Sequence, residues 1–433
     1  MFRKGNLFFL FVLFFCLCFI YAGCGKKRSD SDAVIIWHWM TDRHDTFLKL
    51  SKQYKAETGK TVIFELSAPT DVYTSKVRAA AQTNTLPDIF SVLGVSQDLS
   101  NFIHAGLIHC LTPYMEENHH EWERSFYPNA IGMNAFTEPN QWNVPEGIYG
   151  VPIDVTNIQM IYNKDIFKTA GIDKIPETWE EFLKAGDLVT SKTDKQFFVV
   201  GFGETWLINT MVRIFAYNLI GEKKLIQTIK GECPYSSAEW IDIFNKFREM
   251  SEKKLFAAGI VTMINRNAER LFATGRAAVT YNGSWSVNVF RGMNPDLNYG
   301  TMFFPKISDH YPLLIQGGAG SSLMVSEHSL RKKEAVAFLK WMTSKSSQIF
   351  LSTETNNLPS NKEAVGQMPA ILNEYAKDMD KTFHPALLPV GEDPNIEEAT
   401  ARGIQSIIIG ETTPEELAEK ITLLKKQTLN ESE

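Results

Sequence analysis

The 433-residue chain has only five cysteines, too few for a scaffold built on disulfides. Cys16 and Cys18 lie in an apolar N-terminal run and Cys24 follows it, so Cys110 and Cys233 remain for the folded part. Neither stands in a CxxC spacing of the kind that binds metal or carries redox chemistry. The pair could form one disulfide, but because the two residues lie in distant segments we expect two buried thiols.

The chain also lacks an excess of positive charge. Its formal net charge is −6, and no basic stripe runs through the sequence. Because neutralising phosphates supplies most of the affinity of nucleic-acid-binding proteins, this balance argues against a nucleic-acid partner. Aromatic residues make up 12 % of the chain, and aromatic rings both fill cores and stack on sugar faces. Composition therefore permits a carbohydrate ligand without arguing for one.

A single long apolar run is present, over residues 7–20, and it is too short to span a bilayer comfortably. Arg3 and Lys4 precede it, which gives the segment the proportions of a secretion signal. We predict a signal peptide over residues 1–23. The protein should be exported, and the rest of the chain should not span a membrane.

The residues around Cys24 indicate how the exported chain is held. The preceding Tyr21-Ala22-Gly23 resembles the lipobox at which bacterial lipoproteins are cleaved and acylated on the cysteine, although Tyr21 replaces the usual leucine. The alternative is an ordinary secretion signal that is cleaved nearby. Residues 25–32, GKKRSDSD, are polar and suit a flexible tether. We therefore predict a lipidated cysteine and tether over residues 24–32.

The first third of the mature chain alternates strand and helix patterns. The expected order is a strand over 34–37, a helix over 45–57, a strand over 61–67, a helix over 71–83 and a strand from residue 86. This βαβαβ order implies a parallel sheet whose ligand crevice lies beyond the carboxyl ends of the strands. The loops over residues 38–42 and 91–96 should therefore face that crevice.

The most distinctive stretch, residues 147–182, looks like a crossing between two lobes. Its expected elements are a strand over 149–153 with Pro152 at an edge or connection, a polar stretch over 154–157 and a strand over 158–162. The polar residues either satisfy the backbone of a bend or point into a cleft. A short helix that stops at Gly171 and a helix capped at Thr178 follow.

Four short motifs of this stretch resemble the family 1 extracellular solute-binding proteins, the sugar receptors of ABC importers. The motifs are G-x-P, Y-N-K-x-x-F, A-G and P-x-T-W-E-E-F. The family pattern F-x-x-G-x-A-A-x-x-x-x-G-x-W also recurs in step from Phe272 to Trp285. The resemblance covers nearly the whole mature chain. It implies an α/β, two-lobed periplasmic-binding-protein type II fold, each lobe a mostly parallel sheet flanked by helices. The expected lobes are residues 33–150 plus 316–358, and residues 151–315 plus 359–433.

The resemblance also implies a function. The protein is expected to bind a sugar or oligosaccharide between the lobes by hinge closure and to deliver it to an ABC permease. It would be a monomer and a receptor without catalytic activity, cofactor or metal, tied to the bacterial membrane through the lipid on Cys24. Whether that membrane surface is periplasmic or extracellular stays open.

Candidate ligand residues include aromatic rings and polar side chains, for which the structural alternatives are a core position, a helix cap or a turn. Rings that would stack on sugars are Trp39, Trp206 and Trp285. Side chains that would bond hydroxyls are Asp42, Asp154, Thr156, Asn157 and Asn282. In the family the second crevice loop carries an aromatic or charged residue, whereas this chain has small residues there, including Ser91. Gly317 and Gly318 belong to a glycine-rich stretch, 316–322, whose backbone amides face the cleft in the family.

Two alternative functions stay open. An exported glycosidase would need two carboxylates about 5–9.5 Å apart across a cleft. Asp42 and Asp154 are the only candidates in this sequence for such a pair. A receptor of the same fold could instead bind a polyamine or a glycerol phosphodiester. We interpret Asp88 as a structural cap, and His119 and His120 as surface residues without a metal, because adjacent residues of a helix-like segment point to different faces.

Overall fold

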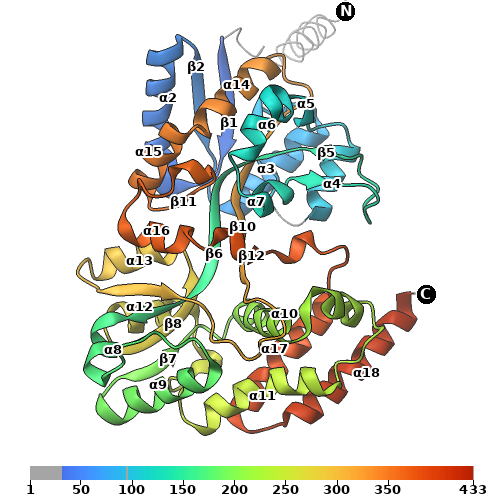
Figure 1. Cartoon of the computed structure of the whole chain (residues 1–433). Helices are drawn as coiled ribbons and strands as arrows, with labels where there is room; N and C mark the ends of the chain where they lie inside the picture. Colours follow the sequence, from blue (N-terminus) through green and yellow to red (C-terminus); the bar gives the residue numbers. More distant parts are fainter. Residues whose placement is uncertain (1–31, 94–95, 433) are drawn as a thin grey trace, which may run out of the picture.

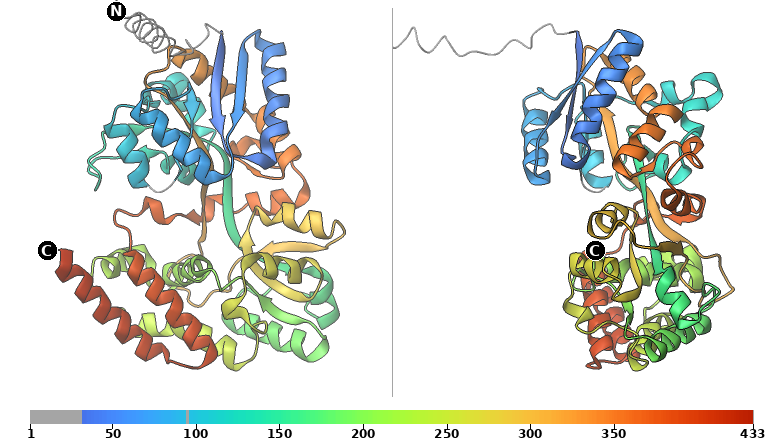
Figure 2. Two further views of the ribbon diagram at one scale, coloured as in Figure 1. Left: turned by 180° about the vertical axis from the view of Figure 1, so that it is seen from behind. Right: turned by 90° about the vertical axis from the view of Figure 1, so that its left-hand side faces the viewer.

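Two long strands connect the halves of the molecule. The computed structural model describes residues 32–93 and 96–432, so the predicted signal peptide and Cys24 lie outside the described residues. Strand β6 (Val151–Asn163) and strand β10 (Ile315–Val325) run antiparallel to each other from an upper to a lower lobe (Figure 1). Both views in Figure 2 show the lobes joined by this narrow connection. The two-lobed α/β fold is thus as predicted.

The upper lobe contains the predicted βαβαβ unit. Strand β1 (Ala33–His38) pairs in parallel with β2 (Thr61–Leu66) and β3 (Ile89–Phe90), and the sheet order is β2-β1-β3-β10. Helices α2 (His44–Thr58) and α3 (Thr70–Gln82) connect these strands. Helix α2 buries Phe47, Leu50 and Tyr54 on its inner face. It ends at Gly59, whose φ of +73° suits a glycine.

Shorter elements complete the upper lobe. They are α4 (Ser96–His104), α5 (Thr112–Met115), α6 (Glu117–Arg124), α7 (Pro128–Gly132), β4 (Ala135–Phe136), β5 (Gly147–Ile148), α14 (Lys332–Met342), α15 (Lys345–Thr355) and β11 (Leu358–Pro359). Asp88 accepts hydrogen bonds from Ile35 N at 2.9 Å and Ser329 Oγ at 2.7 Å, which is the structural role expected for it. His119 and His120 are exposed, and the described residues contain no group of three or more potential metal ligands.

The crossing segment differs from the prediction of two strands separated by a bend. Residues 151–163 form one continuous strand, because Val155, Thr156 and Asn157 all have partners in β10 or β11. Pro152 lies opposite Ser322, where the register of β10 shifts, so its missing N–H falls at an irregularity of the ladder. The glycine-rich stretch, residues 316–322, is likewise part of β10.

The lower lobe builds its sheet around the other ends of the crossing strands. Strand β8 (Ala277–Gly283) pairs antiparallel with β6 and parallel with β7 (Gln196–Val199), while β9 (Tyr299–Met302) pairs antiparallel with β6. Helix α8 (Lys164–Ala170) stops at Gly171, with φ +75°. Helix α9 (Trp179–Lys192) starts with a capping box between Thr178 and Glu181, as its sequence predicts.

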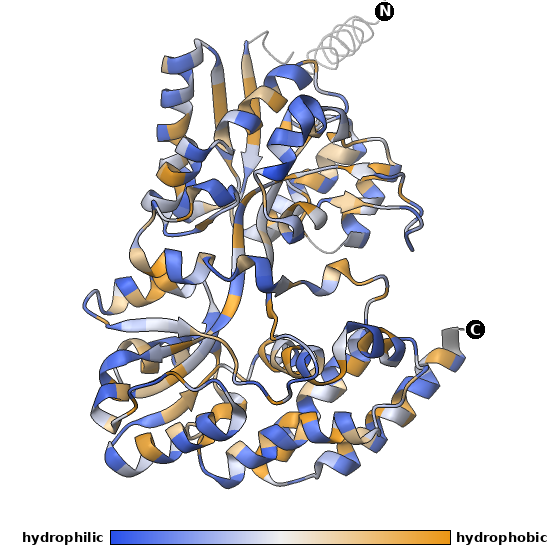
Figure 3. Ribbon diagram, in the orientation of Figure 1, coloured by the Kyte–Doolittle hydropathy of each residue, from blue (hydrophilic) through white to orange (hydrophobic). Residues whose placement is uncertain are grey.

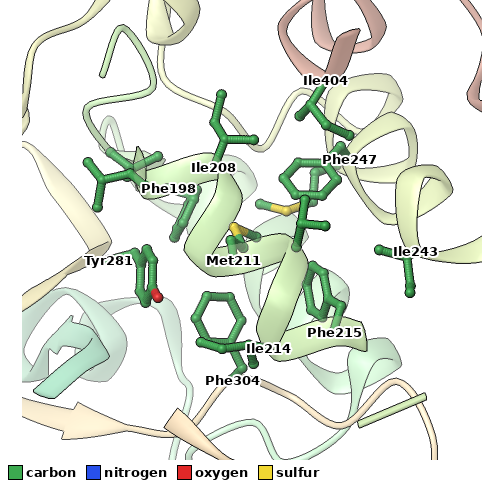
Figure 4. Packing of buried hydrophobic residues seen from close by; sticks show 14 of the residues in the cluster. Phe198, Ile208, Met211, Ile214, Phe215, Ile243, Phe247, Tyr281, Phe304 and Ile404 are labelled. Atoms are coloured by element: carbon green, nitrogen blue, oxygen red, sulfur yellow. The ribbon is translucent and has the colours of Figure 1, made fainter. Parts of the chain in front are cut away.

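A helical layer covers this sheet and contains the larger hydrophobic core. It consists of α10 (Thr205–Ile229), α11 (Ala238–Glu252), α17 (Pro394–Ile409) and α18 (Pro414–Ser432), while α12 (Asn265–Ala273) and α13 (Ser286–Met293) pack in a separate, smaller cluster. Phe215 of α10 packs beside Phe247 of α11 and Phe304, and Ile404 of α17 lies on the far side of Phe247 (Figure 4). Figure 3 shows apolar and polar residues alternating along α17 and α18, as in helices with one buried face. The sequence did not predict α17.

One further segment passes between the lobes. Helix α16 (Ala370–Ala376) and strand β12 (Thr382–Phe383) lead into a short 3-10 helix, η5 (Pro385–Leu387). Strand β12 pairs in parallel with the beginning of β10, at Ile315 and Gln316. Chain segments far apart in sequence therefore meet beside the crossing strands.

The cysteine prediction was only partly right. Cys110 and Cys233 are free thiols, but both are half-buried instead of buried. Among the helices of the described residues, none is both long and apolar enough to cross a membrane.

Candidate ligand-binding site

A cavity of about 260 Å³ opens at the carboxyl ends of β1 and β3, as the strand order predicts. Its walls come from the loop after β1, the loop after β3, the start of α4, the two residues after α7, β10, and the start of η5 with the residue before it. The lining residues are Trp39, Ser91, Val92, Leu93, Ser96, Leu99, Met133, Asn134, Ala319, Gly320, Ser321, Ser322, Met324, His384 and Ala386. Among these there is no Asp, Glu, Lys or Arg.

Trp39 and Ser91, both predicted from sequence, lie in this cavity. The Trp39 ring is half-buried and packs at 5.3 Å from the ring of Tyr73, so its position is fixed by the protein. The Tyr73 hydroxyl accepts from Ser91 N at 2.8 Å and donates to Ser91 O at 3.1 Å. The Ser91 hydroxyl donates to Ser322 O at 2.7 Å. Ser91 is thus a wall residue whose hydroxyl proton is already used within the fold.

Asp154, which was predicted to bond a ligand hydroxyl, lies buried beside Arg43, and its Oδ1 has no hydrogen-bond partner among the described residues. Its buried carboxylate forms an ion pair with Arg43, 3.0 Å from Oδ2 to Nη2. Arg43 Nη2 also donates to Asn357 Oδ1 at 3.1 Å, and Arg43 Nε donates to Asp42 Oδ2 at 3.4 Å. Burial disfavours the charge on Arg43, but Asp154 and Asp42 outweigh burial, and the pKa of Arg43 is raised. Asp42 and Asp154 therefore meet through one guanidinium, as an ion-pair network.

The remaining predicted site residues of β6, and Gly317 opposite them in β10, contact other parts of the protein. Asn157, a predicted ligand residue, is fully buried and donates from Nδ2 to Tyr375 O at 2.8 Å, so its amide is used within the fold. Thr156, opposite Gly318 in the ladder, is half-buried. Gly317 faces Asn157 across the ladder.

The glycines of β10 allow close packing beside the cavity. A Cβ on Gly317 would lie 2.7 Å from the Thr382 methyl group, and one on Gly318 would meet Met133. Gly320, which the sequence did not single out, lines the cavity, and a Cβ there would lie 2.9 Å from Asp154 Oδ2. Side chains at these positions would displace their neighbours.

Trp206 and Trp285 meet in the lower lobe. Trp206 stands in the first turn of α10 and Trp285 just before α13, and their ring centroids are 6.1 Å apart at 49°. Trp206 is 37 % exposed, and its indole N–H donates to Glu204 at 3.2 Å. Trp285 is half-buried against the lower core. The structure thus brings these two predicted rings together, but neither lines the cavity that contains Trp39.

Asn282 was predicted to bond hydroxyls and instead belongs to a buried network. Its amide donates to Glu269 Oε1 at 3.0 Å and to Asn265 Oδ1 at 3.3 Å, and its carbonyl accepts from Gly283 N at 2.8 Å. Burial raises the pKa of Glu269. With its hydrogen-bonding groups satisfied, Asn282 has a structural role.

His384 is a cavity residue that sequence reasoning missed. Its Nδ1 accepts from Ala386 N at 3.2 Å, so the proton of the neutral ring lies on Nε2. Burial lowers the pKa of His384 to about 4, with a smaller contribution from Arg213. The side chain is therefore neutral at ordinary pH. No motif marks His384 in the sequence, because only the β12–β10 pairing brings it to the cavity.

The family of the chain is shown by sequence comparison. Residues 39–349 match the family described as bacterial extracellular solute-binding protein. Since this match covers more than half of the chain, the protein belongs to that family, as its sequence motifs predicted. Membership of an extracellular family means that the protein is exported.

Individual relatives agree with this assignment. The chain is 25 % identical over 334 residues to the multiple sugar-binding protein of Streptococcus mutans, covering 74 % of each chain. It is 24 % identical over 390 residues to the melibiose/raffinose/stachyose-binding protein MelE of Bacillus subtilis, covering 87 % of this chain and 86 % of MelE. The apo-form of RafE from Streptococcus pneumoniae shares the fold, with a TM-score of 0.74 and 18 % identity over 91 % of this chain and 97 % of RafE. The two sequence relatives are binding proteins.

Proposed function

We propose that this protein is the substrate-binding component of an ABC importer and binds a sugar or oligosaccharide between its lobes. The observation that carries the proposal is the composition of the cavity. It combines an indole ring, an amide, hydroxyls and a neutral imidazole, and its described lining has no charged side chain. An uncharged ligand with apolar ring faces and many hydroxyls matches this lining. The names of the two sequence relatives indicate the same class of ligand.

Each cavity side chain has a role in this proposal. Trp39 stacks on a sugar ring, the side-chain oxygen of Asn134 accepts from a hydroxyl because its Nδ2 already donates to Ala130 O, and the Nε2–H of His384 donates to another. Trp206 and Trp285 provide a second aromatic surface on the lower lobe. A ligand that contacts both lobes favours the closed arrangement by its differential affinity, which is how hinge closure operates in periplasmic binding proteins. A buried polar group left without a partner costs about 1–3 kcal/mol, and this cost selects among sugars.

The placement in the cell and the division into lobes are part of the proposal. The lipid on Cys24 holds the protein, as a monomer, at the outer surface of the membrane that contains its permease. The lobes comprise residues 33–150 plus 316–358, and residues 151–315 plus 359–433. The course of β6 and β10 supports a division of the chain along these two strands, since each strand pairs with upper-lobe partners at one end and lower-lobe partners at the other.

The alternatives have less support. A polyamine would call for several carboxylates in the cavity and a glycerol phosphodiester for arginines, and the described lining has neither. The glycosidase alternative relied on Asp42 and Asp154, which both contact Arg43.

A thermal-shift screen of the chain beginning after Cys24 tests the proposal. The ligands are mono- and oligosaccharides, polyamines and glycerol phosphodiesters. A ligand at one hundred times its dissociation constant should stabilise the fold by about 2.7 kcal/mol. We expect a sugar to raise the melting temperature of the wild type and not that of Trp39→Ala. Trp341→Ala is the matched control, because Trp341 is a half-buried tryptophan on α14 outside the cavity. A shift with a charged solute alone would contradict the sugar proposal.

A further inference from the structure

Leu330 projects from the upper lobe without packing partners. It lies in the turn between β10 and α14, and its side chain is 95 % exposed. An apolar side chain in this position gains nothing from the hydrophobic effect on folding. The candidate site does not use it either, since Leu330 does not line the cavity.

Hydrogen bonds place this turn beside the beginning of the folded chain. The Asp88 carboxylate accepts from Ile35 N in β1 and from Ser329 Oγ, the residue before Leu330. Figure 1 shows the beginning of β1 and α14 together at the top of the upper lobe, as does the left view of Figure 2. The cavity lies beyond the other end of β1, a strand of six residues and thus about 20 Å long. Leu330 and the cavity therefore occupy opposite ends of this lobe.

The length of the preceding segment fixes how far a lipid on Cys24 could lie from this turn. Eight residues separate Cys24 from Ala33, the first residue of β1. An extended chain advances at most about 3.6 Å per residue, so the lipid would be within roughly 30 Å of β1. Lys26, Lys27 and Arg28 follow the cysteine almost at once. Such bases are attracted to anionic headgroups.

The composition of the turn suits a lipid surface. Residues 328–334, HSLRKKE, contain three bases and one acid around the exposed leucine. Glu327, just before this segment, is paired with Lys332 at 2.9 Å. Lys333 is exposed. An apolar side chain flanked by bases is the pattern by which peripheral segments bind anionic membranes.

We propose that the turn around Leu330 rests on the anionic lipid surface of the membrane that holds the Cys24 lipid. Leu330 enters the headgroup region, and the exposed Lys333 lies against lipid phosphates. This contact rests on the lipid anchor of the proposed function and adds a defined orientation to it. Because the cavity lies at the other end of the lobe, the contact turns the ligand entrance away from the lipid while the receptor is not docked on its permease.

The test uses the full lipidated chain in vesicles of phosphatidylcholine and phosphatidylglycerol. An environment-sensitive fluorophore is attached at Leu330→Cys, in a background of Cys110→Ser and Cys233→Ser. The matched control is Leu423→Cys, because Leu423 is 61 % exposed on α18 of the lower lobe. We expect several-fold brighter, blue-shifted emission at position 330, quenched by nitroxide-labelled lipids, and water-like emission at position 423. Lys333→Glu should weaken the signal at 330.

Other outcomes overturn the proposal in distinguishable ways. Water-like emission at position 330 on protein that floats with the vesicles would show that the anchor exists without the contact. Failure to float would remove both the anchor and the contact, while the thermal-shift assay would still report on ligand binding. A signal that appears only after permease is added to the vesicles would show that the turn binds protein and not lipid.

Discussion

Arg43 and Asp154 form a buried ion pair that fastens the start of α2 to the crossing strand β6, with 3.0 Å between Nη2 and Oδ2. Removing one partner of such a pair leaves an uncompensated buried charge, at a cost of about 3–5 kcal/mol. We therefore expect Asp154→Ala to lower the free energy of unfolding by that amount, measured by urea denaturation.

An exposed ion pair provides the control for this measurement. Lys49 and Glu354 also form a salt bridge, but Lys49 is largely exposed. Exposed pairs contribute about 0–1 kcal/mol, so Glu354→Gln should change stability little. Equal effects of the two substitutions would contradict the assignment of Asp154 to a structural ion pair.

Stability should depend on pH through two histidines, the buried His38 and the half-buried His384. Burial lowers the pKa of His384 to about 4, and burial together with His44 lowers that of His38 from 6.5 to about 4. The unfolded chain therefore binds more protons than the folded protein between pH 6.5 and 4. The stabilisation is complete above pH 6.5 and is lost as the pH falls toward 4, by about 1.4 kcal/mol per pH unit for each histidine. Unfolding free energies measured across this range should show the slope.

The same histidines can be tested singly. His384→Gln should remove about half of this slope, whereas His310→Gln, at an exposed histidine, should leave it unchanged. A slope that is identical in both variants would mean that other groups carry the pH dependence.

Truncation of Trp206 to alanine should weaken ligand binding more than it lowers the stability of the fold. Its ring is 37 % exposed, so truncation removes little buried core. Loss of one aromatic stacking partner costs about 0.5–1.5 kcal/mol, which corresponds to a decrease in affinity of up to roughly tenfold. Titration calorimetry of Trp206→Ala with the sugar found in the screen measures this change, and its melting temperature without ligand is the control. An unchanged dissociation constant would place Trp206 outside the ligand contact.

Gly320 should tolerate no side chain. A Cβ there would lie 2.9 Å from Asp154 Oδ2 and from the Thr156 methyl group. Overpacking of this kind costs about 1–3 kcal/mol, and Gly320→Ala should also weaken ligand binding because the residue lines the cavity. Gly292→Ala is the control, since a Cβ at Gly292 meets nothing within 4 Å. Thermal melting with and without the sugar separates the two effects.

Much of the fold could be predicted from local patterns. The capping box at Thr178, the glycine stops at Gly59 and Gly171 and the spacing of Phe47, Leu50 and Tyr54 each specify structure through nearby residues. The crossing strands were mispredicted because polar side chains and glycines are typical of turns. Here their backbone groups are satisfied by strands distant in sequence, which no local pattern reveals.

The candidate site was less predictable for the same reason. Asn157 and Asn282 stand at strand positions that could equally face a cleft, but each is satisfied by a partner outside its own strand, Tyr375 and Glu269 respectively. His384 reaches the cavity only through the pairing of β12 with β10. Trp39 was identified because the carboxyl end of a parallel strand is a general location for ligands, independent of tertiary detail.

The uninterrupted course of β6 between the lobes has a mechanical consequence. A two-stranded ribbon whose ladder continues from Val151 with Leu323 to Ile158 with Gln316 resists sharp folding, because a kink would break backbone hydrogen bonds. It can still twist, and it twists most easily where the register shifts near Ser321. Relative motion of the lobes would then be a torsion spread over several residues. The ladder amides on either side of Ser321 would remain protected from hydrogen exchange throughout this motion.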